Sequence, residues 1–168
     1  MSESATAKPP LTTPAPAGLL RRVCSLVYEA LLLAAVLFFA GYVFSALLPR
    51  ASAGWERNVF QFALFSVGGL YFGWSWSAGR RTLPMKTWRL RLETTTGEAL
   101  SWRAALKRYI FAWAAPLLAL GGYLAAGPWG LAVGALPYLW ALVDPDRQFL
   151  HDRLSGTRIL RESPSVAR

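Results

Sequence analysis

The sequence predicts an all-α, polytopic membrane protein with about four transmembrane helices and a short cytoplasmic strand or hairpin between the second and third. Hydrophobic residues make up 54% of the 168 residues, charged residues only 16%, and eight residues are Trp. Long apolar runs recur along the chain, with basic residues collected in the segments that flank them. A chain this short has too little interior for so much apolar surface, whereas a bilayer acts as its solvent.

The basic balance of the chain fits a membrane better than a nucleic acid. The formal charge is +9 and the isoelectric point is near 10.4, which in a soluble chain would indicate nucleic-acid binding. Here the basic residues flank apolar runs, the pattern that orients a membrane protein. We expect no nucleic-acid partner; the expected partners are the bilayer and its anionic headgroups at the cytoplasmic face. The single cysteine, Cys24, allows no intrachain disulfide.

The first two spans are predicted at about 23–48 and 58–79. Residues 1–18, rich in Pro, Ser, Thr and Ala, are expected to be a disordered tail, as are residues 163–168 at the other end. The first apolar run exceeds the roughly 7–15 residues of a signal-peptide core, so it is expected to stay uncleaved. In the second run, Gly68 and Gly69 would let another helix approach closely.

The segment 80–108 carries eight Lys and Arg and cannot span a membrane. Trp88, Leu90 and Leu92 alternate with polar residues, which predicts a short strand, and the following TTTG predicts a turn. From about Ser101 the spacing becomes helical and continues into the next apolar run.

The apolar run 109–143 is too long for one crossing, at roughly 52 Å if it were one helix. The sequence GPWG at 127–130 is the natural break, which gives spans at about 109–126 and 129–143. Each arm is short, so a re-entrant hairpin remains the alternative to two full spans.

The distribution of basic residues predicts the orientation. Sixteen Lys and Arg lie in the N-terminal segment, the 80–108 loop and the C-terminal segment, against two in the first short loop. This predicts a multi-pass protein of the inner membrane with both termini in the cytoplasm.

An acidic residue interrupts the first predicted span. An acid at mid-span costs roughly 2.5–3.5 kcal/mol on insertion scales, so Glu29 requires a proton, a partner or a wet cavity. Arg22 lies two helical turns earlier on the same face. The cationic candidates for pairing with Glu29 are Arg22, Arg108 and Arg153.

The C-terminal segment LVDPDRQFLHDRLSGTRIL is the second charged constellation. Its acids Asp144 and Asp152 alternate with Arg153 and other arginines, and its apolar residues are spaced to pack the segment onto the cytoplasmic face. His151 beside Asp152 has no third ligand at convincing spacing, and no nucleophile stands near a base. We therefore expect that the protein has no metal site, binds no cofactor and is not an enzyme.

Together these motifs resemble the RDD family of small bacterial membrane proteins, which is named for an Arg and two Asp. The resemblance covers about residues 19–162. It places Arg22 at the Arg position, Glu29 at the first Asp position and Asp152, in HDRLSGT, at the second. It also implies that Lys86, in TLPMKTWRLRL, and Arg108 fall on recurrent positions. Glu29 in place of Asp keeps the charge, whereas Pro84 stands where the family's loop usually has Gly.

Two functions remain open on the sequence. One is a small transporter, or cation- or proton-coupled carrier, that uses the intramembrane carboxylate, in a family for which cation/proton exchange has been proposed. Four short helices enclose little volume, so this role would require a homo-oligomer. The other is a non-catalytic membrane scaffold or accessory subunit in which Arg22, Glu29, Arg108 and Asp152 lock the helices to a cytoplasmic cap.

Overall fold

The computed structural model describes residues 17–47 and 54–162. Of these residues, 74% are helical. The predicted tails, 1–18 and 163–168, lie outside the described residues except for Ala17 and Gly18, of which Ala17 is buried. The prediction of a mainly helical chain is confirmed.

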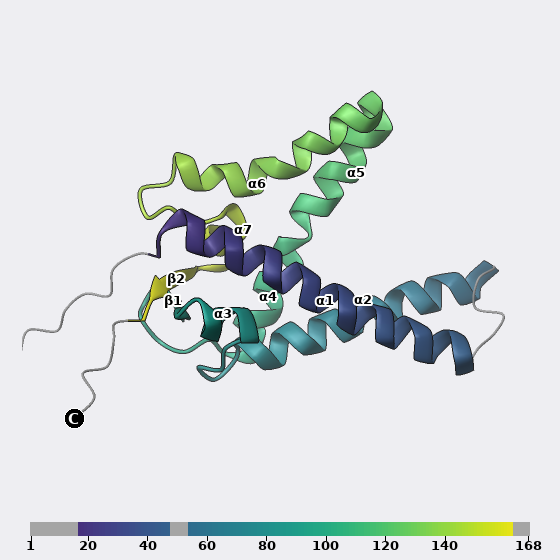
Figure 1. Ribbon diagram of the computed structural model, residues 1–168, viewed down its shortest axis with the longest axis horizontal. Helices are drawn as coiled ribbons and strands as arrows, with labels where there is room; N and C mark the ends of the chain where they lie inside the picture. Colours follow the sequence, from purple (N-terminus) through teal and green to yellow (C-terminus); the bar gives the residue numbers. More distant parts are fainter. Residues whose placement is uncertain (1–16, 48–53, 163–168) are drawn as a thin grey trace, which may run out of the picture.

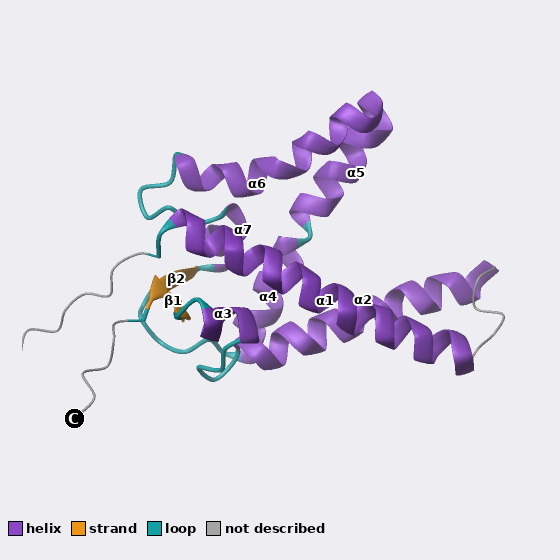
Figure 2. Cartoon of the chain, in the orientation of Figure 1, coloured by secondary structure: helices purple, strands orange, loops and turns teal. Residues whose placement is uncertain are grey.

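The first two helices form an antiparallel pair. Helix α1 spans Leu19–Leu47 and α2 spans Gly54–Trp76, and the two run side by side to one end of the molecule (Figures 1 and 2). Near that end the rings of Phe44 and Phe60 lie 5.2 Å apart. Helix α2 ends three residues before the predicted boundary, because Ala78 and Gly79 adopt positive φ.

Two helical stretches of the described chain are long and apolar enough to cross a membrane. They are Leu19–Leu47, with mean hydropathy 2.3, and Trp102–Leu142, with mean hydropathy 1.6. In their most apolar windows, 0% and 6% of the residues are buried inside the protein. An apolar surface of this extent requires lipid or another apolar partner. Helix α2 is not among these stretches, so the four-span arrangement stays a prediction.

A short two-stranded sheet lies at the other end of the α1–α2 pair (Figure 2). After the small helix α3, Leu83–Thr87, strand β1, Leu90–Thr94, pairs antiparallel with β2, Thr157–Arg161. The predicted strand is therefore confirmed, but the hairpin alternative is wrong. The chain turns after β1 as TTTG predicts, yet the partner strand arrives from the C-terminal segment.

Helix α4, Trp102–Ala112, begins where the sequence predicts and is capped by the Ser101 hydroxyl. It packs on α2 at three glycines. A Cβ added at Gly68 would lie 2.7 Å from the Tyr109 hydroxyl, and one added at Gly73 would lie 2.7 Å from the Trp102 ring. The close helix approach expected at Gly68 and Gly69 is thus present, and α4 is the partner.

The second apolar stretch folds back as predicted. Helix α5, Ala114–Ala126, ends at Gly127, whose φ is +65°. The returning arm is the 3₁₀ helix η1, Gly127–Ala135, followed by α6, Leu136–Leu139, and η2, Trp140–Leu142. The predicted span 129–143 is therefore built from 3₁₀ turns and one short α-helix, and not from a single regular α-helix. Pro128 and Pro137 lack the N–H that an α-helical ladder needs.

The buried core lies where α2, α3, α4 and the sheet meet. Helix α7, Leu150–Ser155, closes this region and is ended by Gly156 at φ +68°. The core side chains come from α2, α3, α4 and the two strands: Phe72, Trp76, Met85, Leu90, Leu92, Ala105, Tyr109 and Ile159. The polar residues that the sequence predicts as a site lie beside this core.

Candidate functional site

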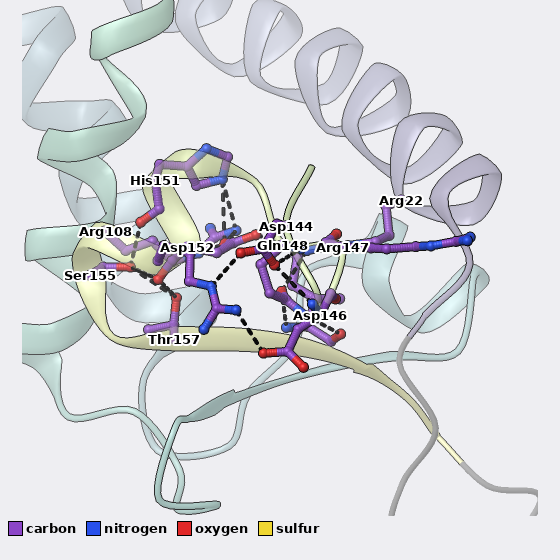
Figure 3. Close-up of polar contacts among 12 residues, drawn as sticks. Arg22, Arg108, Asp144, Asp146, Arg147, Gln148, His151, Asp152, Ser155 and Thr157 are labelled. Atoms are coloured by element: carbon purple, nitrogen blue, oxygen red, sulfur yellow. Dashed lines mark hydrogen bonds and ion pairs between the residues drawn. The ribbon is translucent and has the colours of Figure 1, made fainter. Parts of the chain in front are cut away.

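Asp152 lies at the centre of a buried ionic cluster that joins three helices (Figure 3). Arg22 of α1 donates from Nη2 to Asp152 Oδ2 at 2.9 Å. Arg108 of α4 donates to Oδ1 from Nε at 3.0 Å and from Nη2 at 2.8 Å. The side chains of Arg22 and Asp152 are completely buried, and that of Arg108 is 5% exposed. We call Arg22, Arg108, His151 and Asp152 the Asp152 cluster.

The guanidinium group of Arg22 is tied to the segment before α7 by further bonds. Its Nη2 donates to Gln148 Oε1 at 2.7 Å, and its Nη1 donates to the carbonyl of Arg147. The carbon of the guanidinium lies 4.7 Å from the centre of the Phe149 ring. Arg108 has an equivalent apolar contact, 4.1 Å from the Trp76 ring. Both cations therefore have charged and aromatic partners, which offsets part of the cost of burying them.

The electrostatics of α7 follow from the two arginines. Burial alone would raise the pKa of Asp152, but the charges of Arg108 and Arg22 and the hydrogen bonds from Arg108 hold it below its usual value. Burial lowers the pKa of His151 to about 4. The charge of Asp152 acts to raise this pKa, whereas the charges of Arg108 and Arg22 act to lower it. His151 is therefore neutral at pH 7, and its Nε2 can accept the bond from Arg108 Nη2 at 3.3 Å.

Asp144 and Arg153 form a separate, partly exposed ion pair. Arg153 Nε donates to Asp144 Oδ1 at 2.6 Å, and its Nη2 donates to Asp146 Oδ2 at 2.8 Å. Burial opposes ionisation of Asp144, yet the bond from Arg153 and the backbone N–H of Gln148 bring its pKa below the usual value. The hydrogen bond to Asp144 raises the pKa of Arg153. This pair fixes the loop that carries Gln148.

Glu29 is buried on α1, and none of its three candidate arginine partners is bonded to it. The hydroxyl of Tyr71, on α2, donates to Glu29 Oε1 at 3.1 Å. The hydroxyl of Thr82, which caps α3, donates to Oε2 at 2.6 Å. Arg22 and Arg108 instead take Asp152 as their counterion, and Arg153 takes Asp144. The reason is reach, because two helical turns separate Arg22 from Glu29 along α1.

A hollow of about 40 Å³ is bordered by both Arg22 and Glu29. It is lined by Arg22, Ser25 and Glu29 on α1 and by five apolar side chains, including Leu26 and Met85. A space of this size holds about three water molecules. Arg22 and Glu29 therefore both border a small, partly open space of the size of a few water molecules.

The four secondary residues of the predicted site, Lys86, Asp144, His151 and Arg153, do not lie together in the structure. His151 belongs to the Asp152 cluster, and Asp144 and Arg153 support it from the loop. Lys86 is exposed on α3 and makes no side-chain bond among the described residues. Among residues 17–47 and 54–162, no group of three His, Cys, Asp or Glu side chains is arranged to hold a metal ion.

Sequence reasoning missed the hydroxyl partners of Glu29. Tyr71 stands in an aromatic stretch that suggests the membrane interface, so its role as a donor had no local signal. Thr82 precedes Pro84, and the pattern Thr-x-Pro is typical of a helix start. That pattern identifies the cap, and thus a rigidly placed hydroxyl. Pro84 occupies the first turn of α3, where no N–H is needed.

Comparison with known proteins gives one match. The RDD family model matches residues 16–156, which include Arg22, Glu29, Arg108 and Asp152. No curated protein and no solved structure matches the chain.

Proposed function

This chain belongs to the RDD family, and from that premise we propose that it is a small carrier in which the Glu29 carboxylate binds and releases a proton or another cation. Its family and its two long apolar helical stretches indicate a membrane protein. The carrier role and the transported ion are the parts that we propose.

The observation that supports this role is the environment of Glu29. The residue is 9% exposed, lies in an apolar helix long enough to span a membrane, and is bonded by two neutral hydroxyls. An ionisable group inside such a segment is a functional candidate by default. Because no arginine is bonded to it, Glu29 can change protonation state without breaking a hydrogen bond to a guanidinium group, which Asp152 cannot do.

The proposed setting follows from the distribution of charge. We place the protein in the inner membrane as a multi-pass chain, with both termini and the basic 80–108 segment in the cytoplasm. Anionic headgroups are the proposed partners of that segment. The role is non-enzymatic and uses no cofactor, and transport takes place in a homo-oligomer because one chain encloses little volume.

Flux through reconstituted protein tests the carrier role. Proteoliposomes loaded with a pH-sensitive dye are given a sodium gradient, and proton movement is followed by fluorescence. We expect flux from the wild type and its loss in Glu29→Gln. The matched control is Glu98→Gln, which neutralises an exposed carboxylate in the loop after β1 and should leave flux unchanged. Absence of flux from the wild type, or unchanged flux in Glu29→Gln, contradicts the proposal.

A second function, a membrane scaffold, is favoured by the Asp152 cluster. Its three ion-pairing residues lie on α1, α4 and α7, so the cluster fastens both apolar stretches to the C-terminal segment. Such a lock serves a structural subunit as well as a carrier. The flux test separates the two functions. A scaffold predicts no proton flux from the wild type and a change in stability, but not in flux, for Glu29→Gln.

A further inference from the structure

We propose that the hollow between Arg22 and Glu29 binds one small monovalent anion, such as chloride, when Glu29 carries a proton. The inference rests on the proposed function in one respect, namely that Glu29 exchanges a proton. It adds an anion to the ions that this protein handles.

Arg22, which lines the hollow, carries an unpaired hydrogen-bond donor. The terminal nitrogens of the Arg22 guanidinium are used by Asp152, Gln148 and the Arg147 carbonyl. Its Nε–H is buried and has no hydrogen-bond partner among the described residues. Arg22 is 2% exposed and lines the hollow. A buried donor on a cation is costly to leave unpaired, so a ligand that accepts this bond is favoured.

The second donor is Ser25, one helical turn along α1. It is 6% exposed and lines the same hollow, and its hydroxyl makes no hydrogen bond within the described part of the chain. A guanidinium group and a hydroxyl on two residues that line one small space are groups that bind halides. The rest of the lining is apolar, which strengthens an electrostatic contact by lowering the local dielectric constant.

The third step is the charge balance. Arg22 and Arg108 carry two positive charges and Asp152 one negative charge, while His151 is neutral. Ionised Glu29 supplies the second negative charge. When Glu29 takes up a proton, the buried group retains one uncompensated positive charge. A monovalent anion in the hollow restores neutrality, so proton and anion bind together.

When Glu29 is protonated, the lining disfavours a metal cation in the same place. Sodium requires several oxygen ligands, yet the hollow offers Glu29, Ser25 and apolar side chains, with the Arg22 cation at one end. Its volume of about 40 Å³ suits a single monatomic anion with a water molecule. Large anions do not fit, which provides a control.

The groups around Glu29 determine how the test is read. Tyr71 faces it from α2, the charge of Arg108 acts on it from α4, and Arg22 lies on its own helix. His151 and Asp152 of α7 lie beyond the arginines. The pKa of His151 is about 4 in the folded chain, so the experiment must separate a change in its charge from a change at Glu29.

Thermal unfolding of the full chain in detergent tests the site, with chloride as the probe and gluconate at equal ionic strength as the reference. For the wild type at pH 7.5 we expect the same midpoint in both salts. At pH 5 chloride should raise the midpoint by about 3–5 °C when present at about ten times its Kd. Glu29→Gln, whose amide imitates the protonated acid, should show this rise at pH 7.5 as well, where His151 is neutral.

Two variants on α1 locate the effect. Ser25→Leu fills the hollow and should abolish the difference between chloride and gluconate. Ser45→Leu makes the same change at an exposed position of that helix and should preserve it. Equal midpoints in the two salts for Glu29→Gln, a chloride effect in the wild type that ignores pH, or one that survives in Ser25→Leu each overturns the proposal. The Glu29→Gln comparison decides alone if Ser25→Leu does not fold.

The outcomes also separate this inference from the carrier role. Flux that depends on Glu29, without any chloride effect in Glu29→Gln, retains the carrier and removes the anion site. A chloride effect in protein that gives no proton flux retains the anion site and removes the carrier.

Discussion

Asp152 and Glu29 are both buried carboxylates, but their surroundings differ in the kind of donor. Asp152 accepts its bonds from two guanidinium groups on two helices and is fully buried. Glu29 accepts its bonds from the hydroxyls of Tyr71 and Thr82 and borders a hollow. A cation makes the loss of a carboxylate charge expensive, whereas a hydroxyl can rotate to serve either protonation state.

This difference divides structural from exchangeable charge. The pKa of Asp152 lies below its usual value, so this acid stays ionised and holds α1, α4 and α7 together. Glu29 has no cation bonded to it, so its proton can come and go at lower cost. The same helix, α1, thus contributes a fixed cation at Arg22 and, two turns later, an acid that is free to titrate.

The largest effect is expected from Asp152→Asn. The change removes the counterion of both Arg22 and Arg108 while they remain buried, and it should lower the free energy of unfolding by about 3–5 kcal/mol. Thermal unfolding in detergent measures the loss, and a variant too unstable to purify would agree with it. Asp146→Asn is the control, because that carboxylate is 64% exposed. Equal midpoints for wild type and Asp152→Asn would show that the cluster carries no structural weight.

His151 should make the stability depend on pH. Its pKa is about 4 in the folded chain and 6.5 when unfolded, so the unfolded state binds the proton first as pH falls. The contribution of neutral His151 is complete above pH 6.5 and is lost toward pH 4, by about 3 kcal/mol in total. Unfolding midpoints at pH 7.5, 5.5 and 4.5 measure this.

His151→Gln is the control for that profile. Glutamine can accept the bond from Arg108 and does not titrate, so the slope between pH 6.5 and 4 should flatten. Asp152 acts only at lower pH, since its pKa is depressed below 3.8. A wild-type profile that is already flat over this range would contradict the assignment of a neutral, buried His151.

Much of the Asp152 cluster was predictable because its parts are local motifs. Arg22 opens an apolar run, Arg108 closes a basic segment, and Asp152 stands in HDRLSGT. Which acid each arginine selects was not predictable. That choice depends on α7 folding back under α1, a contact between residues 130 positions apart. Helix periodicity along α1 suggested Glu29 as the partner of Arg22, but the two-turn distance favoured the acid that arrives from elsewhere.

For the fold, too, local features were predictable from the sequence and long-range contacts were not. The alternation around Leu90 predicts a strand, and GPWG predicts the reversal at Gly127, since both are encoded within a few residues. The strand's partner, β2, and the 3₁₀ geometry of the returning arm depend on long-range packing and on two prolines. The terminal tails and the first short loop fall wholly or mostly outside the described residues.

Glu29→Gln should affect stability far less than Asp152→Asn. The amide oxygen can still accept one hydroxyl bond, and no cation loses its bonded counterion, so we expect a loss of about 1 kcal/mol. The measurement is the same unfolding curve, taken in gluconate so that no small anion compensates. A loss as large as that of Asp152→Asn would mean that Glu29 is a structural acid, and the distinction between the two carboxylates would disappear.

Arg153→Gln should have the smallest effect. Arg153 is paired with Asp144 and Asp146, but its side chain is 38% exposed, and exposed ion pairs contribute under about 1 kcal/mol because water and salt screen them. The loss should shrink further at high ionic strength, in contrast with Asp152→Asn, whose loss should not, because its partners are buried. Unfolding curves of both variants at low and high sodium gluconate measure this. A salt-independent loss of several kcal/mol in Arg153→Gln would contradict this expectation. It would mean that the Asp144–Arg153 pair stabilises the fold together with the Asp152 cluster, because Asp144 accepts a hydrogen bond from the backbone N–H of Gln148.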